Sequence, residues 1–195
     1  MGATSTLRLR IVSGGQTGAD QAALAFARRR GWPHGGWCPR GRRTEAGPLP
    51  ARYDLRETPS RGYRQRTEWN VRDSGGTVVF SLAARLAGGS ATTAACARRL
   101  GKPWLHLTPV EPHPGRRLRA FLAAHGIRTL NVAGPRASEE PGVGAFVGCV
   151  LAAAFRRPSP GQTQSRPRGA APAGRLARRT VPGYFRRPHE LSRTR

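Results

Sequence analysis

Hydrophobic and polar residues follow two periods along this chain. Short apolar or alternating runs, which are typical of strands, occur at 7–12, 77–82, 104–107 and 127–133, with a further short one near 34–37. Apolar residues at helical spacing predict helices over 19–30, 60–73, 90–100, 116–125 and 143–155. Because strands that alternate with helices form parallel βαβ units, we expect a Rossmann-like, three-layer α/β/α domain with a mainly parallel sheet of about five strands.

Charge sets the C-terminal end of the chain apart. The 195 residues include 34 basic and 10 acidic side chains, a formal net charge of +24. Residues 156–195 hold eleven Arg and one Glu among many Pro, Ser and Gly, with almost no apolar periodicity. Such a segment buries too little apolar surface to fold. We expect a domain over residues 1–155 and a disordered, Arg/Pro-rich tail over 156–195 that binds nucleic acid weakly and without sequence preference.

Cysteine content and hydropathy bear on location. Cys38, Cys96 and Cys149 lack the C-x-x-C spacing of a zinc site, and we expect no metal site. Three cysteines without a pattern are typical of a reducing cytoplasm, where we expect the protein. The sequence has no secretory signal and no apolar run long enough to span a bilayer, so no membrane partner is expected. Homo-oligomerisation stays open.

The first predicted strand ends in a glycine-rich turn, Ser13-Gly14-Gly15-Gln16-Thr17-Gly18-Ala19-Asp20. A strand that feeds such a turn into a helix presents free backbone N–H groups to an anion, and glycine lets a phosphate approach without a Cβ atom in the way. The alternative is an ordinary tight turn with Thr17 and Asp20 as a capping box. The candidate ligand-binding residues in this turn are Gly14, Gly15, Gln16, Thr17, Gly18 and Asp20.

Two further turns follow predicted strands. One contributes Gly88, Gly89, Ser90, Thr92 and Thr93 as candidate ligand-binding residues, and the other contributes Asn131, Gly134 and Arg136. Hydroxyl groups and an arginine suit a phosphate, although the same residues could simply cap or start helices. Because ligands of open parallel sheets bind at the carboxyl ends of the strands, we expect the three turns to line one cleft.

The predicted helix over 60–73 is dense in polar residues. Arg66, Asn70 and Asp73 share one stripe, and Glu68 is spaced to pair with Arg72. A solvated helix face is one interpretation of this pattern. The other is that Arg66, Thr67 and Asn70 contact the ligand.

Four segments, at 11–20, 34–43, 66–74 and 131–136, together resemble the putative molybdenum carrier proteins. That family is also described as a circularly permuted YpsA-like branch of the SLOG superfamily, which includes DprA and LOG proteins. The resemblance spans roughly residues 8–155. It implies a Rossmann-like domain whose glycine-rich turns hold a nucleotide-like or molybdopterin-like phosphorylated ligand, so that the bound group would be a nucleotide or the molybdenum cofactor.

Three functions follow from these patterns. The leading hypothesis is a cytoplasmic sensor or carrier that binds the phosphorylated ligand without turnover. The second is an N-glycosidic hydrolase of the LOG phosphoribohydrolase type, but Ala95 stands where the LOG motif has its glutamate. Glu68 and Asp20 are the candidates to replace that carboxylate. The third is a nucleic-acid-binding module, which the net charge favours.

Overall fold

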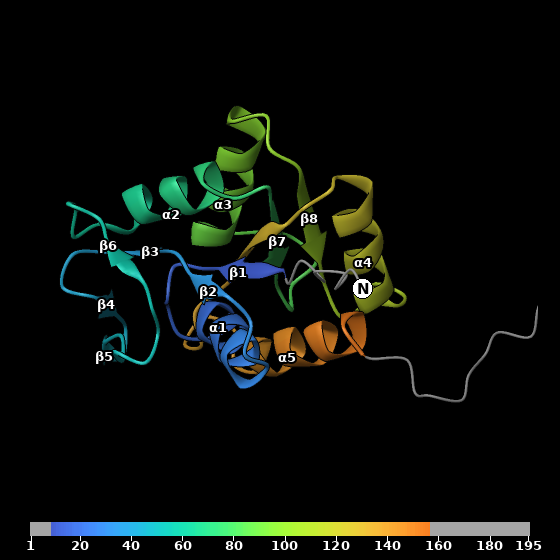
Figure 1. Ribbon diagram of the computed structural model, residues 1–195, viewed down its shortest axis with the longest axis horizontal. Helices are drawn as coiled ribbons and strands as arrows, with labels where there is room; N and C mark the ends of the chain where they lie inside the picture. The colour runs from blue at the N-terminus through green and yellow to red at the C-terminus, as the bar shows by residue number, and fades with distance from the viewer. Residues whose placement is uncertain (1–8, 157–195) are drawn as a thin grey trace, which may run out of the picture. The chain divides into compact units, whose positions relative to one another are not determined.

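The computed structural model describes residues 9–156, and its central element is a five-stranded parallel sheet (Figure 1). The strand order is β2-β1-β9-β7-β8, so the last strand in the sequence lies in the middle. Ile11 of β1 lies opposite His34 on one side and Leu130 on the other. The expected α/β class with a parallel sheet is confirmed. Apart from Arg156, the predicted tail lies outside the described residues.

The elements fall close to their predicted positions. The strands of the main sheet are β1 (Arg10–Val12), β2 (His34–Gly35), β7 (Gly76–Phe80), β8 (Trp104–Leu107) and β9 (Thr129–Ala133). The helices are α1 (Ala19–Arg29), α2 (Tyr63–Arg72), α3 (Gly88–Arg99), α4 (Pro114–Ala124) and α5 (Val143–Ala154). Helix α4 begins two residues earlier than expected, because proline is well tolerated in a first turn.

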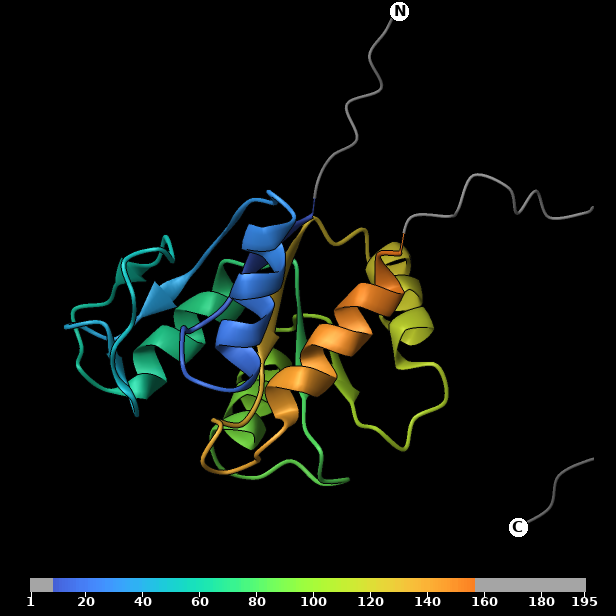
Figure 2. The ribbon, with the colours of Figure 1, turned by 90° about the horizontal axis from the view of Figure 1, so that it is seen from below.

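One face of the sheet is sealed by α1, α4 and α5. Figure 2 shows α1 and α5 side by side across this face. The core beneath them is aliphatic and fully buried, with Val147 and Leu151 from α5, Leu118 from α4 and Leu130 from β9. Burial of this much apolar side-chain surface is the main force that holds the domain together.

The other face carries α2 and α3. Helix α3 lies against β7 and β8, and α2 packs on α3 through a small cluster of Val71, Cys96 and Ala97. Of the residues in α2, Asn70 and Val71 are buried. This layer is therefore thin and polar compared with the layer on the opposite face.

Residues 37–57 form an insertion with short strands of its own. It contains β3 (Trp37–Cys38) paired in parallel with β6 (Arg56–Glu57), and β4 (Arg43–Thr44) paired with β5 (Gly47–Pro48). Arg42 organises it, since its guanidinium donates four hydrogen bonds of 2.8–3.1 Å to the carbonyl oxygens of Leu49, Pro50, Tyr53 and Leu55. Because Arg42 provides hydrogen-bond partners for these backbone carbonyl groups, the irregular segment can pack on the domain without leaving them unpaired.

Candidate functional site

The three glycine-rich turns meet at the carboxyl edge of the sheet. They enclose a cavity of about 70 Å³, here called the edge hollow, together with the start of α2. The first turn supplies Gln16 and Asp20, the second Gly89, Ser90 and Thr93, the third Gly134 and Arg136, and α2 supplies Tyr63, Arg66 and Thr67. Residues that are far apart in the sequence thus share one small polar cavity.

A buried ion pair crosses the edge hollow. Arg66 Nη1 lies 2.9 Å from Asp20 Oδ2, and the backbone N–H of Gln16 donates to the same carboxylate at 3.2 Å. Burial raises the pKa of Asp20, and the charge of Arg66 offsets only part of that rise. A Cβ atom at Gly14 would lie within 1.4 Å of Arg66 Nη1, so glycine is needed at that position to leave room for the guanidinium.

Two of the residues that line the edge hollow carry an unsatisfied donor. Arg66 Nε and Gln16 Nε2 are buried and have no hydrogen-bond partner among residues 9–156. The Gln16 side chain is held in place because its Oε1 accepts from the N–H groups of Thr17 at 3.0 Å and Glu45 at 2.9 Å. Each unsatisfied buried donor costs about 1–3 kcal/mol. A ligand with several acceptor oxygens would remove that cost.

Glu45, from the insertion, ties the first turn to the third. Its carboxylate accepts from the hydroxyls of Thr17 and Ser138, and also from the Ser138 N–H at 3.3 Å. These hydrogen bonds lower the pKa of Glu45. Arg136 lies 3.9 Å from Glu45 and 3.1 Å from Glu139, so the arginine expected to bind an anion already has two carboxylate neighbours.

Sequence comparison identifies the family. A model of the circularly permutated YpsA SLOG family matches residues 11–155. The chain belongs to this family. It is 40% identical to a putative molybdenum carrier protein from Syntrophus aciditrophicus SB, and the match covers 76% of this chain and 96% of that chain with a TM-score of 0.74. No curated protein matches significantly.

Four of the six glycines in the predicted ligand turns of this SLOG domain are required by close packing, as Gly14 is. Gly15 has a φ of +78°, and a Cβ atom there would lie 2.6 Å from Leu49 Cδ2. At Gly18 and Gly134 the added atom would lie within 2.6 Å of Pro135 O and 2.7 Å of Phe80 O. Packing against Leu49 therefore accounts for the glycine at position 15, and a role of Gly15 in the approach of a ligand stays a prediction. Among residues 9–156, no protein atom lies within 4 Å of an added Cβ at Gly88 or Gly89, and Gly89 lines the edge hollow.

Two local interpretations of the sequence are corrected. Helix α1 has Gly18 as its N-cap, without a side-chain cap, and Thr17 does not form a capping box with Asp20. The stripe on α2 is not a solvated face. Asn70 exchanges two hydrogen bonds of 2.9 Å with the backbone of Trp37, so it anchors the insertion.

Several expected site residues lie outside the edge hollow. Gly88 and Thr92 are exposed at the start of α3, and Glu68 pairs with Arg99 at 3.0 Å on the outer side of α2 and α3. Glu68 does not pair with Arg72, which binds Asp73 instead. Asn131 donates to Thr77 at 3.2 Å and borders a second, much smaller cavity beside Gly14.

Tyr63 and Glu45 belong to the site but were not anticipated. The Tyr63 ring lies 5.7 Å from the Arg66 guanidinium and 5.8 Å from that of Arg136. Neither residue lies in a strand-to-helix turn, and no local pattern marks them. Among residues 9–156 there is no group of three or more His, Cys, Asp or Glu that could hold a metal ion. None of the helices in that range is long and apolar enough to cross a membrane.

Proposed function

We propose that this protein is a sensor or carrier that binds a small phosphorylated ligand, of nucleotide or molybdopterin type, at the edge hollow. One observation carries the proposal: Arg66 Nε and Gln16 Nε2, on two residues that line the edge hollow, are buried donors with no hydrogen-bond partner among residues 9–156. Phosphate oxygens accept several hydrogen bonds at once and pair well with arginine. The first turns of α1 and α3 add the positive ends of two helix dipoles.

The size of the edge hollow limits which part of the ligand enters it. Whole-ligand pockets have volumes of about 300–1,000 Å³. The edge hollow, at about 70 Å³, is far smaller and suits a single anionic group. We infer that the phosphate end is bound inside and that the base or pterin lies outside. The name of the relative from Syntrophus aciditrophicus supports a molybdenum-containing ligand, since a molybdopterin carries a phosphate that the same donors would hold.

Native mass spectrometry of the full chain, purified without added ligand, tests whether a phosphorylated compound stays bound. Calorimetric titration with AMP then tests the site. We expect Arg66→Gln to weaken AMP binding by at least about tenfold, because a charge-assisted hydrogen bond is lost. Arg64→Gln is the matched control, since Arg64 is exposed on the same helix. Equal affinities of the two variants would refute the proposal.

A second candidate function, nucleic-acid binding, rests on the eleven arginines of residues 156–195. Deletion of residues 157–195 should abolish retention on a nucleic-acid column at low salt while AMP binding is unchanged. If the shortened protein is still retained, the SLOG domain itself binds nucleic acid.

A further inference from the structure

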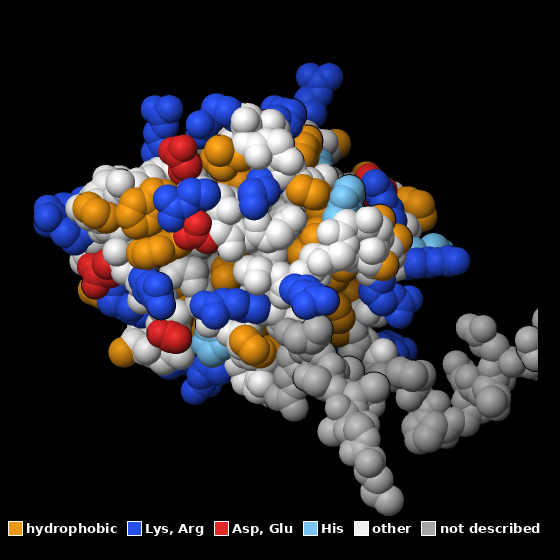
Figure 3. Space-filling model, turned by 45° about the horizontal axis from the view of Figure 1, so that its top comes forward, with side chains coloured by type: hydrophobic (Ala, Val, Ile, Leu, Met, Phe, Trp, Pro, Cys, Tyr) orange, Lys and Arg blue, Asp and Glu red, His pale blue; other side chains and the backbone are white. Residues whose placement is uncertain are grey.

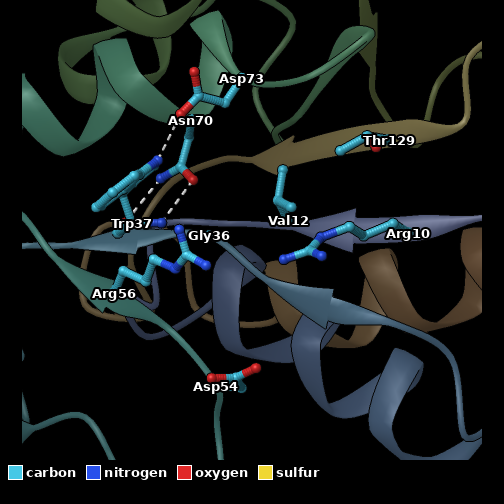
Figure 4. A pocket seen from close by; sticks show the side chains of 9 residues that line it. All are labelled: Arg10, Val12, Gly36, Trp37, Asp54, Arg56, Asn70, Asp73 and Thr129. Atoms are coloured by element: carbon cyan, nitrogen blue, oxygen red, sulfur yellow. Dashed lines mark hydrogen bonds between the residues drawn. The ribbon is translucent and has the colours of Figure 1, made fainter.

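A second and larger cavity lies on the side of the sheet that carries α2. Its volume is about 460 Å³, and we call it the face hollow. Figure 4 shows the side chains that line it, from β1, the insertion, the end of α2 and the start of β9. This volume is within the usual range for small-molecule sites, about 300–1,000 Å³. No sequence motif points to it.

Two arginines reach into the face hollow from opposite sides. Figure 4 shows the guanidinium groups of Arg10 and Arg56 directed toward each other across it. A Cβ atom at Gly35 would lie 3.0 Å from Arg10 Nη2, so glycine leaves room for this side chain to cross β2. Within residues 9–156 neither guanidinium donates a hydrogen bond or forms an ion pair. Two such cations facing one cavity favour a bound anion.

Two carboxylates, Asp54 and Asp73, also line the face hollow, and neither forms an ion pair with Arg10 or Arg56. Asp73 accepts from Arg72 at 2.6 Å and from the Trp37 indole N–H at 2.8 Å. Asp54 also lines the hollow, on the same segment as Arg56, and forms no ion pair with any described residue (Figure 4). Within residues 9–156, both guanidinium groups are therefore left without an ion-pair partner.

Trp37 forms a fixed aromatic wall. Its backbone N–H and carbonyl are both bonded to Asn70, and its indole N–H is bonded to Asp73. The Trp69 ring meets it edge-on at a centroid distance of 4.7 Å. A ring held in place on so many sides can stack on a flat ligand without losing conformational freedom.

We propose that the face hollow is a binding site for an aromatic phosphate monoester. The phosphate dianion lies between Arg10 and Arg56, and the aromatic ring lies against Trp37. The two hollows lie at different positions along α2: Arg66 lines the edge hollow, and Asn70, one turn further along, lines the face hollow. The proposal is independent of the function assigned to the edge hollow.

The Trp37 indole N–H is the reporter for a test. Full-length, ¹⁵N-labelled protein contains four tryptophans, and a Trp37→Phe variant assigns the signal of Trp37. Titration with phenyl phosphate at constant pH should shift this signal to saturation, while the signal of Trp104, on the far edge strand, stays in place. The Arg10→Gln/Arg56→Gln variant should bind at least about tenfold more weakly, because two charge-assisted contacts are lost. Arg28→Gln/Arg40→Gln is the charge-matched control and should bind normally.

Three results would overturn the proposal. The first is a Trp37 signal that does not respond, or that responds equally in both double variants. The second is inorganic phosphate binding as tightly as phenyl phosphate, which would exclude the role of the Trp37 ring. The third is a Trp37 signal that shifts with protein concentration alone, which would mean that a second copy of the chain covers the face hollow.

Discussion

The two faces of the sheet differ in how their helices are packed. Under α1, α4 and α5 the sheet buries a continuous aliphatic core, whereas α2 buries only Asn70 and Val71. Figure 3 shows Lys and Arg side chains spread over the side of α2 and α3, with few acidic ones between them. Both hollows border α2.

This difference has a physical basis. An apolar layer excludes water and is stabilised by close packing of its side chains. It therefore leaves no cavity for a polar ligand. A polar layer contributes less to stability but can keep charged groups such as Arg66 half-buried and ready to bind. Buried polar groups without hydrogen-bond partners reduce stability, and such groups are expected at functional sites, where they can bind a ligand.

The largest effect is expected from a cavity in the sealed face. Leu151→Ala should lower the free energy of unfolding by about 2–5 kcal/mol, because the side chain is fully buried among aliphatic neighbours. Chemical denaturation measures the loss, and Leu82→Ala at a partly exposed position is the control. A small loss at Leu151 would mean that the two faces do not differ as described. AMP affinity should be unchanged.

Two glycines of the predicted ligand turns should behave oppositely. Gly15→Ala should destabilise the fold by about 1–3 kcal/mol, since it strains a residue at positive φ and collides with Leu49. Gly89→Ala meets no protein atom and should leave the thermal midpoint nearly unchanged, but it should weaken AMP binding by narrowing the edge hollow. Thermal unfolding measures the stability of both variants, and calorimetric titration measures their affinity for AMP. Equal destabilisation would contradict the distinction.

Asp20 should make anion binding depend on pH. Its pKa is raised in the folded protein, so its contribution to stability is present below its unfolded pKa and is lost as pH rises through its folded pKa. As pH rises through the folded pKa of Asp20, its carboxylate becomes ionised and repels a bound anion. The charge of sulfate does not change over this pH range, so the affinity for sulfate should fall severalfold.

Asp20→Asn provides the control for this pH effect. The variant should bind sulfate with little pH dependence, and its stability relative to the natural chain should improve as pH rises through the folded pKa of Asp20. Calorimetric titration at several pH values measures the affinity. If Asp20→Asn retains the pH dependence of the natural chain, a titrating group other than Asp20 causes that dependence.

The smallest expected effect is on catalysis. Incubation with AMP should release no detectable adenine by chromatography, because Ala95 replaces the LOG glutamate, and Glu68 pairs with Arg99 away from the edge hollow. Release that disappears in Glu68→Gln or Asp20→Asn would make the protein a hydrolase, and the polar face would then be catalytic.

The sequence by itself determined the elements and their class. Periodicity identified the five strands of the main sheet and all five helices, because a buried strand and an amphipathic helix each impose a local pattern. Parallel pairing followed from the alternation of strands and helices. The convergence of the three turns could also be anticipated, since carboxyl ends of parallel strands share one edge.

Only the tertiary structure decided what each site residue does. Asp20 meets Arg66 across 46 positions, and Glu45 meets Ser138 across 93. Gly14 makes room for a guanidinium and Gly15 for Leu49, although both look like phosphate-binding glycines in the sequence. The insertion held by Arg42 brings Trp37 to α2 and creates the face hollow. Such contacts depend on the positions of distant segments in space, which no local pattern of residues records.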